Sequence, residues 1–506
     1  MIVDQSLDEV AARLKAQKAC VLRATLLADL ETPVAAFLKL RHGRKGPAFL
    51  LESVEGGAVR GRYSMIGLDP DFIWRCRNGA AEISREPGEP SASFVPDERA
   101  PLESLRALIA ESAIDLAHDL PPMSAGLFGY LGYDMVRLME RLPEPNSDAL
   151  RVPDAILVRP TVMVVFDAVR DEISLLTPIR PQPGVPAKAA YESALARLES
   201  VMWALERPLP LEERADPRRI AFEEPSSNTS PAEYEAMVEC AKEYIRAGDV
   251  FQVVLSQRFE APFPLPPFAL YRSLRRVNPS PFLCYLDFNE FQIVCSSPEI
   301  LVRVRDGKVT IRPIAGTRPR GATPGDDRRL ADELLADPKE RAEHLMLLDL
   351  GRNDVGRVAQ LGTVEVTDSF FLEYYSQVMH IVSNVEGRLD PRHDALDALV
   401  GGFPAGTVSG APKVRAMEII DELEKDKRGP YAGCIGYFGA NGEMDTCIVL
   451  RTAVVKDGRM AVQAGAGIVY DSDPASEQQE CVNKAKAQFR AAEEAVRFAS
   501  RARRGQ

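Results

Sequence analysis

The chain has 506 residues and a formal net charge of −12, with 45% hydrophobic and 27% charged residues. This length exceeds what one hydrophobic core usually organises, so we expect two domains or one large composite domain. The acidic balance argues against nucleic acid or an anionic membrane as the main partner. The first residues, MIVDQSLDEV, do not resemble a signal peptide, and no apolar run is long enough for a membrane span, which favours a cytoplasmic protein.

Cysteine and histidine usage gives no sign of a metal centre. The eight cysteines are scattered without a Cys-x-x-Cys pair, and none of the five histidines is paired at ligand spacing. We therefore expect reduced, mostly buried thiols and no zinc site.

The first part of the chain mixes helical patterns (Ser6 to Ala19, Ala187 to Glu206) with strand patterns such as Ala155 to Asp167. The glycine-rich run SAGLFGYLGYD (Ser124 to Asp134) lacks G-x-G-x-x-G, which excludes a dinucleotide site and indicates close-packed strands. A polar, proline-rich linker follows the second helix. We divide the chain into an N-terminal segment (1–205), this linker (206–231) and a C-terminal segment (232–506).

The C-terminal segment alternates helical and strand patterns. A helix that Gly248-Asp249 ends precedes a strand, and a later helix opens at Asp337-Pro338 with Glu340 completing a capping-box pattern. Asp457-Gly458 predicts a hairpin turn. The helices expected here are Ala232 to Ala247, one opening at Pro338 and one after Pro412, and the strands are Val250 to Phe259, Phe282 to Phe288, Phe291 to Ile300, Val309 to Thr317, Val378 to Gly387, Arg428 to Gly439 and Asp445 to Val455.

Four residues of this segment stand where their chemistry needs an explanation. Glu299 follows Ser-Ser-Pro at a strand end and is either a functional acid or an exposed loop carboxylate. Glu343 lies on an apolar helix face, where a salt bridge or a metal would satisfy it. His380 is either a core histidine or catalytic, and Arg451, in an apolar strand run, needs an anion.

Residues 463–486, QAGAGIVYDSDPASEQQECVNKAK, join a strand pattern to a long helix. Bare glycine amides between the two elements form either a tight turn or an anion cradle. Asp473-Pro474 predicts the helix start, and Glu480 and Lys484 then share one helix face. With Glu343, Arg451 and a second glycine loop at residues 403–412, these groups suit a small anionic substrate and a divalent metal, for which Mg²⁺ is the natural choice.

The runs DVFQVVLSQRF, PIAGTRPRG, AEHLMLLDLGRND, VMHIVSNVEG, FPAGTVSGAPK, RGPYAGCIGYFG, DTCIVLRTA and AGAGIVYDSDPASEQQE resemble the chorismate-utilising enzyme family. The resemblance covers about Asp249 to Lys486 and, more weakly, Leu50 to Asp134. It implies a large α/β (α+β) fold in which sheets and helices from both chain segments enclose one site. The implied reaction is the Mg²⁺-dependent conversion of chorismate and ammonia to anthranilate and pyruvate.

The resemblance also implies roles for individual residues. Glu343 and Glu480 match the Mg²⁺ ligands, and Glu299 matches the acid that protonates the departing hydroxyl. His380 and Thr407 match further catalytic positions. The positions matching substrate contacts are Gly316, Thr317, Tyr431, Arg451, Gly465, Ala466, Gly467 and Lys484.

Two positions separate the members of this family. Where water-using members carry a lysine base, this chain has Gln252, and where aminodeoxychorismate synthases carry a lysine nucleophile, it has Ala315. Neither side chain can act in that way, so ammonia remains as the nucleophile. The near-motif around Cys434 lacks a downstream histidine, so we expect a separate glutamine amidotransferase subunit to supply ammonia.

The resemblance further implies a feedback site for tryptophan. The hypothesised contacts are Ser53, in the run Leu50 to Gly57, and Pro281, Phe282 and Leu283. Phe282 stands where tyrosine is frequent in the family, so the aromatic wall is kept without a phenolic hydrogen bond. Two alternatives stay open at this point: an aminodeoxychorismate synthase component, and a regulatory homologue without catalysis.

Overall fold

A computed structural model of the chain describes residues 2–55, 59–85, 93–210, 222–375 and 378–499. The helices are α1 (Leu7–Lys15), α2 (Pro33–Arg41), α3 (Pro101–Glu111), α4 (Ala187–Glu206), α5 (Pro231–Ala247), α6 (Pro267–Val277), α7 (Pro324–Ala336), α8 (Pro338–Gly356), α9 (Ala395–Gly402), α10 (Lys413–Leu423) and α11 (Pro474–Ala499), with 3-10 turns η1 (Tyr133–Leu138) and η3 (Gly406–Val408).

The strands are β1 (Cys20–Leu27), β2 (Ala48–Glu55), β3 (Val59–Arg77), β4 (Ala80–Ser84), β5 (Val95–Pro96), β6 (Gly126–Leu131), β7 (Ala155–Asp167), β8 (Glu172–Ile179), β9 (Ser226–Ser227), β10 (Gln252–Pro262), β11 (Phe282–Asp287), β12 (Phe291–Ser297), β13 (Ile300–Arg305), β14 (Lys308–Ile311), β15 (Ile314–Pro319), β16 (Glu365–Tyr374), β17 (Val378–Arg388), β18 (Gly410–Ala411), β19 (Cys434–Gly439), β20 (Met444–Ile448), β21 (Thr452–Lys456) and β22 (Arg459–Ile468). This mixture of helices and strands confirms the predicted fold class.

Strands from the two predicted chain segments pair with one another. Leu51 of β2 lies opposite Cys284 of β11, and Tyr130 of β6 lies opposite Ile435 of β19. Helices α4 and α5 flank the predicted linker, of which residues 211–221 lie outside the described residues. The predicted division therefore follows the order of the chain but does not separate two sheets.

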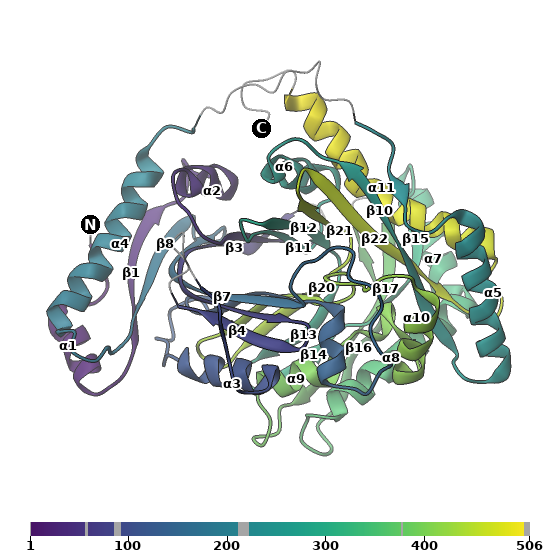
Figure 1. The fold of residues 1–506 in the computed structure, drawn as a ribbon, viewed down its shortest axis with the longest axis horizontal. Helices are drawn as coiled ribbons and strands as arrows, with labels where there is room; N and C mark the ends of the chain where they lie inside the picture. Colours follow the sequence, from purple (N-terminus) through teal and green to yellow (C-terminus); the bar gives the residue numbers. More distant parts are fainter. Residues whose placement is uncertain (1, 56–58, 86–92, 211–221, 376–377, 500–506) are drawn as a thin grey trace.

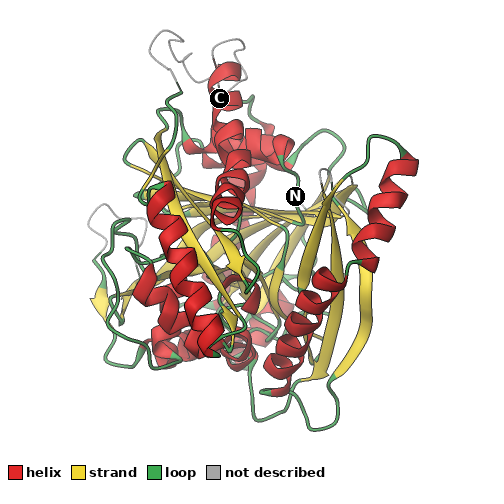
Figure 2. Cartoon of the chain, turned by 90° about the vertical axis from the view of Figure 1, so that its right-hand side faces the viewer, coloured by secondary structure: helices red, strands yellow, loops and turns green. Residues whose placement is uncertain are grey.

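Two layers of strands face each other around a shared core (Figure 1). Side chains of β2, β3, β11 and β12 meet those of β6, β7, β19 and β20 in one buried hydrophobic cluster. Helices cover the outside of these layers: α1 and α4 lie on one flank of Figure 1, and α5, α10 and α11 on the other. In the turned view of Figure 2 the strands run between helices on either side. Among the described residues, no helix has the length and apolar character of a membrane span.

The glycine-rich run before Asp134 is close-packed, as predicted. Gly126 and Gly129 of β6 have φ of +150° and +158°. A Cβ at Gly126 would lie 2.1 Å from the carbonyl oxygen of Phe438, and one at Gly129 would lie 2.0 Å from that of Ile156. The missing side chains let β6 approach its two neighbouring strands.

Local signals for helix and turn boundaries are confirmed. Gly248, at φ +85°, caps α5, and Asp473 Oδ1 accepts from the amide of Ser476 at 2.9 Å at the start of α11. Asp337 accepts from the amides of Lys339 and Glu340 at the start of α8. The capping-box prediction is wrong in its second half, because Glu340 Oε1 instead accepts from Arg318 Nη1 at 2.9 Å.

Other local predictions are wrong as well. The predicted strand Val309 to Thr317 is divided between β14 and β15, and the strand predicted from Arg428 begins only at Cys434, in β19. The run Asp445 to Val455 is not one strand, because Arg451 has φ +49° and lies between β20 and β21. The glycines Gly465 and Gly467 are not in a turn before the long helix, because they belong to β22 and pair with Ser256 and Val254 of β10. These glycines therefore do not form a loop that could cradle an anion. They lie in a strand, and their lack of side chains leaves the surface of that strand bare.

Candidate active site

Glu299 lies between β12 and β13 and is 6% exposed. Its Oε1 accepts a hydrogen bond from Thr407 Oγ1 at 3.1 Å, which joins the acid to the turn η3. Burial raises the pKa of Glu299 to about 8, although Thr407 and the amide of Ile314 oppose the rise. The carboxyl group therefore holds a proton near neutral pH, as a general acid requires. The alternative of an exposed loop carboxylate is excluded.

His380 of β17 is fixed by the strand beside it. Its Nδ1 lies 3.0 Å from the carbonyl oxygen of Gly316 and 3.0 Å from Thr317 Oγ1 on β15. A carbonyl oxygen can only accept, so Nδ1 carries the hydrogen and Nε2 keeps a free lone pair. Burial lowers the pKa of His380 to about 4, and the charge of Arg451 adds to the effect. The ring is neutral at physiological pH.

Carboxylates from two helices face a common region. Glu343 Oε1 of α8 accepts from Gln252 Nε2 at 3.3 Å, so its partner is an amide rather than the expected cation. Burial raises the pKa of Glu343, and the charges of Glu340 and Glu480 raise it further. Mutually repelling carboxylates supply the hard oxygen donors that Mg²⁺ prefers, so these residues fit a divalent cation.

Lys484 of α11 and two glycines of β22 lie beside these carboxylates. Lys484 Nζ donates to the carbonyl oxygen of Gly465 at 2.9 Å and lies 2.7 Å from Glu480 Oε1. A Cβ at Gly465 would lie 2.8 Å from Tyr431 Oη, and one at Gly467 would lie 2.5 Å from Gln252 Nε2. The bare face of β22 therefore lets Tyr431 and Gln252 lie against the strand.

Arg451 is a half-buried cation close to these groups. Burial lowers its pKa, while the charge of Glu480 and Tyr431 act in the opposite direction. Within the described part of the chain, no carboxylate lies within 4.0 Å of its guanidinium group. The carbonyl oxygen of Arg451 accepts from the amide of Ser296 at 3.2 Å, which fixes the backbone. An anionic ligand would satisfy this guanidinium group, as its sequence context requires.

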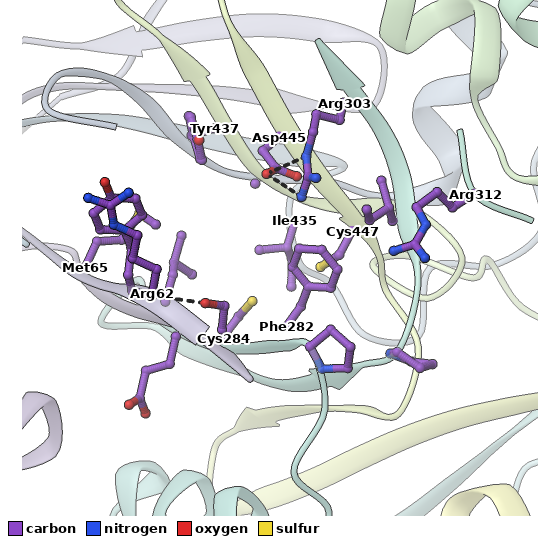
Figure 3. Close-up of a pocket in the computed structure, with 18 of the residues that line it drawn as sticks. Arg62, Met65, Phe282, Cys284, Arg303, Arg312, Ile435, Tyr437, Asp445 and Cys447 are labelled. Atoms are coloured by element: carbon purple, nitrogen blue, oxygen red, sulfur yellow. Dashed lines mark hydrogen bonds and ion pairs between the residues drawn. The ribbon is translucent and has the colours of Figure 1, made fainter. Parts of the chain in front are cut away.

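A cavity of about 910 Å³ lies between the two strand layers (Figure 3). Ser53, Pro281 and Phe282, three of the predicted tryptophan contacts, line it. Leu283 is 1% exposed and packs in a different hydrophobic cluster, on the other face of β11. The structure therefore brings three of the four predicted contacts together. Gly56 and Gly57, from the same predicted site, lie outside the described residues.

Tyr375 is a residue that sequence reasoning missed. It lines the cavity, and its ring lies 5.5 Å from that of His380. Its hydroxyl donates to Glu373 Oε2 at 2.8 Å, and Glu373 pairs with Arg312. Nothing in the run FLEYYSQ distinguishes this tyrosine from Tyr374, because its position depends on the register of β16 against β17.

Comparison with known proteins gives one consistent family. The family model described as chorismate binding enzyme matches residues 48–490. Anthranilate synthase component 1 of Cereibacter sphaeroides is 58% identical over 492 residues, which are 97% of this chain and 98% of that protein. The same component of Thermus thermophilus is 48% identical over 474 residues, covering 93% and 97%.

Solved structures agree. Anthranilate synthase component I from Streptococcus pneumoniae has a TM-score of 0.75 and 38% identity, covering 92% of this chain and 99% of that one. The isochorismate synthase MenF of Escherichia coli, at 18% identity and a TM-score of 0.70, covers 96% of this chain and 98% of its own and shares the fold. The chain therefore belongs to the chorismate-utilising enzyme family, among the relatives of anthranilate synthase component I.

Proposed function

We propose that this chain converts chorismate and ammonia to anthranilate and pyruvate, as the large subunit of an anthranilate synthase. The observation that carries the proposal is that the two positions that distinguish family members hold neither a base to activate water nor an internal nucleophile. Gln252 donates its amide to Glu343, and Ala315 is 9% exposed and ends in a methyl group. Neither can activate water or attack the ring, so an external amine is required.

The chain's own groups suit the remaining steps. Glu299 protonates the departing C4 hydroxyl, because burial keeps its proton available. The guanidinium group of Arg451 binds the enolpyruvyl carboxylate, with Tyr431 beside it. His380 presents the lone pair of Nε2 for proton transfer or hydrogen bonding. Glu343 and Glu480 would hold Mg²⁺, which would neutralise the ring carboxylate of chorismate.

The first test is product analysis by fluorescence and mass detection with purified protein, chorismate, Mg²⁺ and ammonium. Anthranilate and pyruvate are expected, with at least a tenfold weaker response to Mg²⁺ in Glu480→Gln. Glu493→Gln, an exposed carboxylate on the same helix, is the matched control. Isochorismate, salicylate or aminodeoxychorismate as the product would reject the proposal, and no turnover at all would favour the regulatory homologue.

We further propose that ammonia comes from glutamine through a separate glutamine amidotransferase subunit. The relatives' name, component 1, supports a second component. The chain alone is expected to use ammonium but not glutamine. Turnover of glutamine by the purified chain would contradict this proposal.

Tryptophan is the proposed feedback inhibitor, bound in the cavity beside Phe282. Neighbouring residues of β11 provide a matched pair, because Phe282 lines the cavity and Leu283 faces the opposite core. Phe282→Ala is expected to weaken tryptophan binding at least tenfold in calorimetric titration. Leu283→Met should leave the affinity unchanged, and equal effects of the two variants would place the inhibitor elsewhere.

A further inference from the structure

Three cysteines far apart in sequence meet between the strand layers. Cys284 lies on β11, Cys295 lies directly opposite it on β12, and Cys447 lies near the end of β20. Their three sulfur atoms all lie within 4.8 Å of one another, and each thiol is buried and free. The sequence spacing gave no hint of this cluster, because the fold alone brings the three strands together.

The spacing of the sulfur atoms is close to that of a thiolate metal centre. A zinc–sulfur bond of about 2.3 Å in tetrahedral geometry places sulfur atoms about 3.8 Å apart. Side-chain rotations that move each sulfur atom by less than about 1 Å would therefore bring all three sulfur atoms within bonding distance of one ion. A thiolate metal centre needs several sulfur ligands around one ion. Three mutually close thiols provide them, whereas an ordinary pair of packed cysteines does not.

The cluster has an entry path. Cys284 and Cys447 line the 910 Å³ cavity, and Figure 3 shows their side chains on its wall near Phe282 and Ile435. The nearby carboxylate, Asp445, is paired with Arg303 at 2.9 Å. A metal that enters the cavity therefore meets soft sulfur donors, with room for a fourth ligand on the open side.

In the metal-free protein the thiol of Cys295 donates to the carbonyl oxygen of Leu450, with 3.8 Å between the sulfur and oxygen atoms. The thiols must lose their protons to act as ligands, and a bound cation would promote this deprotonation.

We propose that Cys284, Cys295 and Cys447 bind one thiophilic cation, Zn²⁺ or Cd²⁺, with the fourth coordination position open to the cavity. Soft thiolate donors select such ions over Mg²⁺. The site uses none of the groups assigned to chorismate chemistry, so it does not depend on the proposed function. An ion there would cross-link β11, β12 and β20, and it would form part of the wall beside Phe282.

The test is a Cd²⁺ titration of the full chain, followed by the ultraviolet charge-transfer absorption of cadmium thiolates. The titrated protein carries Cys240→Ser, which removes the exposed cysteine among the described residues. A single equivalent is expected to bind, with affinity reduced at least tenfold by Cys284→Ser, Cys295→Ser or Cys447→Ser. Cys434→Ser, a buried thiol outside the cluster, is the control. Full affinity in any one cluster variant, or no absorption in the starting protein, would overturn the proposal.

A second measurement needs no substitution in the cluster, and so holds even if a buried variant fails to fold. X-ray absorption of the Zn²⁺-loaded Cys240→Ser protein is expected to show three sulfur neighbours at about 2.3 Å and one lighter ligand. A shell made only of nitrogen and oxygen, or with a single sulfur, would contradict the site. Loading should also raise the melting temperature with metal concentration, because the ion binds the folded state.

Discussion

At the scale of single residues, the chemistry rests on how burial acts on Glu299. Removal from water disfavours the carboxylate, and only Thr407 and the amide of Ile314 offset this. The buried environment that excludes water from the departing hydroxyl therefore also keeps Glu299 protonated, and this proton is the one that the departing hydroxyl needs. A solvent-exposed glutamate would have lost that proton below pH 7.

Glu299→Gln is expected to lower kcat by about 10²- to 10⁴-fold, because an amide cannot donate a proton to the leaving group. Its KM for chorismate should change little, since shape and hydrogen bonding are conserved. In the parent, rates divided by the concentration of free NH₃ should fall as pH rises through about 8, where the acid ionises. Anthranilate fluorescence measures both quantities. A variant that keeps the parent's kcat would remove Glu299 from the chemistry.

The same pKa shift makes stability depend on pH. The folded carboxyl of Glu299 keeps its proton up to about pH 8, whereas in the unfolded chain it ionises at a pKa of about 4.3. Between these values the folded state binds more protons, so this group lowers the free energy of unfolding as pH rises. Urea denaturation at several pH values should show a smaller decline in Glu299→Gln than in the parent. An equal decline would mean that the carboxyl is already ionised in the folded protein.

At the scale of elements, the pairing of β22 with β10 depends on glycine. A Cβ at Gly465 would lie 2.6 Å from the carbonyl oxygen of Leu255 and 2.8 Å from Tyr431 Oη. Gly465→Ala should therefore cost about 1–3 kcal/mol through overpacking and also weaken chorismate binding. Gly356→Ala, at the end of α8 with no atom within 4 Å of the added Cβ, should be neutral or stabilising. Denaturation and KM together test the pair, and similar losses in both variants would contradict this account.

The buried ion pair between Arg428 and Glu424 connects several elements, including the turn η3. Arg428 Nη2 donates to Glu424 Oε1 at 2.5 Å and to the carbonyl oxygen of Val254 on β10 at 2.6 Å. Its Nη1 donates to the carbonyl oxygen of Val408 in η3, next to Thr407. The pair therefore connects the end of α10 to the turn that holds the partner of Glu299.

Arg428→Met should cost about 3–5 kcal/mol, because it leaves the buried carboxylate of Glu424 without its cation. The double variant with Glu424→Gln should recover part of this loss, since no charge then remains unpaired. Arg392→Met breaks an exposed pair with Asp390 and should leave the denaturation midpoint unchanged. A loss in Arg428→Met no larger than that of Arg392→Met would show that the buried pair does not hold these elements.

These elements also show which parts of the structure could be predicted from sequence. The cap of α8 at Asp337 and the Asp457-Gly458 turn, with φ of +50° and +71°, follow from local chemistry and were predicted. The apolar neighbours of Arg451 predict a position inside a strand, which is wrong. Its φ is instead +49°, and its carbonyl oxygen accepts a hydrogen bond from the amide of Ser296, which is about 150 residues away in the sequence. The periodicity of a sequence does not show which distant strands pair, or in what register. For the same reason it does not predict the position of Tyr375 or the cysteine cluster.

At the scale of the whole molecule, the two chain segments complete each other. Pairing of β2 with β11 and of β6 with β19 joins them through backbone hydrogen bonds. Side chains add to this: Glu52 accepts from Tyr271 Oη and Arg275 Nε, each at 2.6 Å. Arg106 of α3 donates to Asp397 of α9 at 2.7 Å. Each segment alone would expose strand edges and the apolar side chains that lie between the layers.

Fragments 1–210 and 211–506, made separately, should therefore show no cooperative thermal transition, while their co-expression should restore a soluble complex and chorismate turnover. Full-length protein cleaved after folding at a protease site inserted between residues 206 and 231 is the matched control. It should stay associated in size-exclusion chromatography, because the strand pairs do not depend on the connecting peptide. Calorimetry and circular dichroism of each fragment measure the outcome. Cooperative unfolding of 211–506 alone would mean that the C-terminal segment has a sufficient core of its own and that the shared strands are not required for folding.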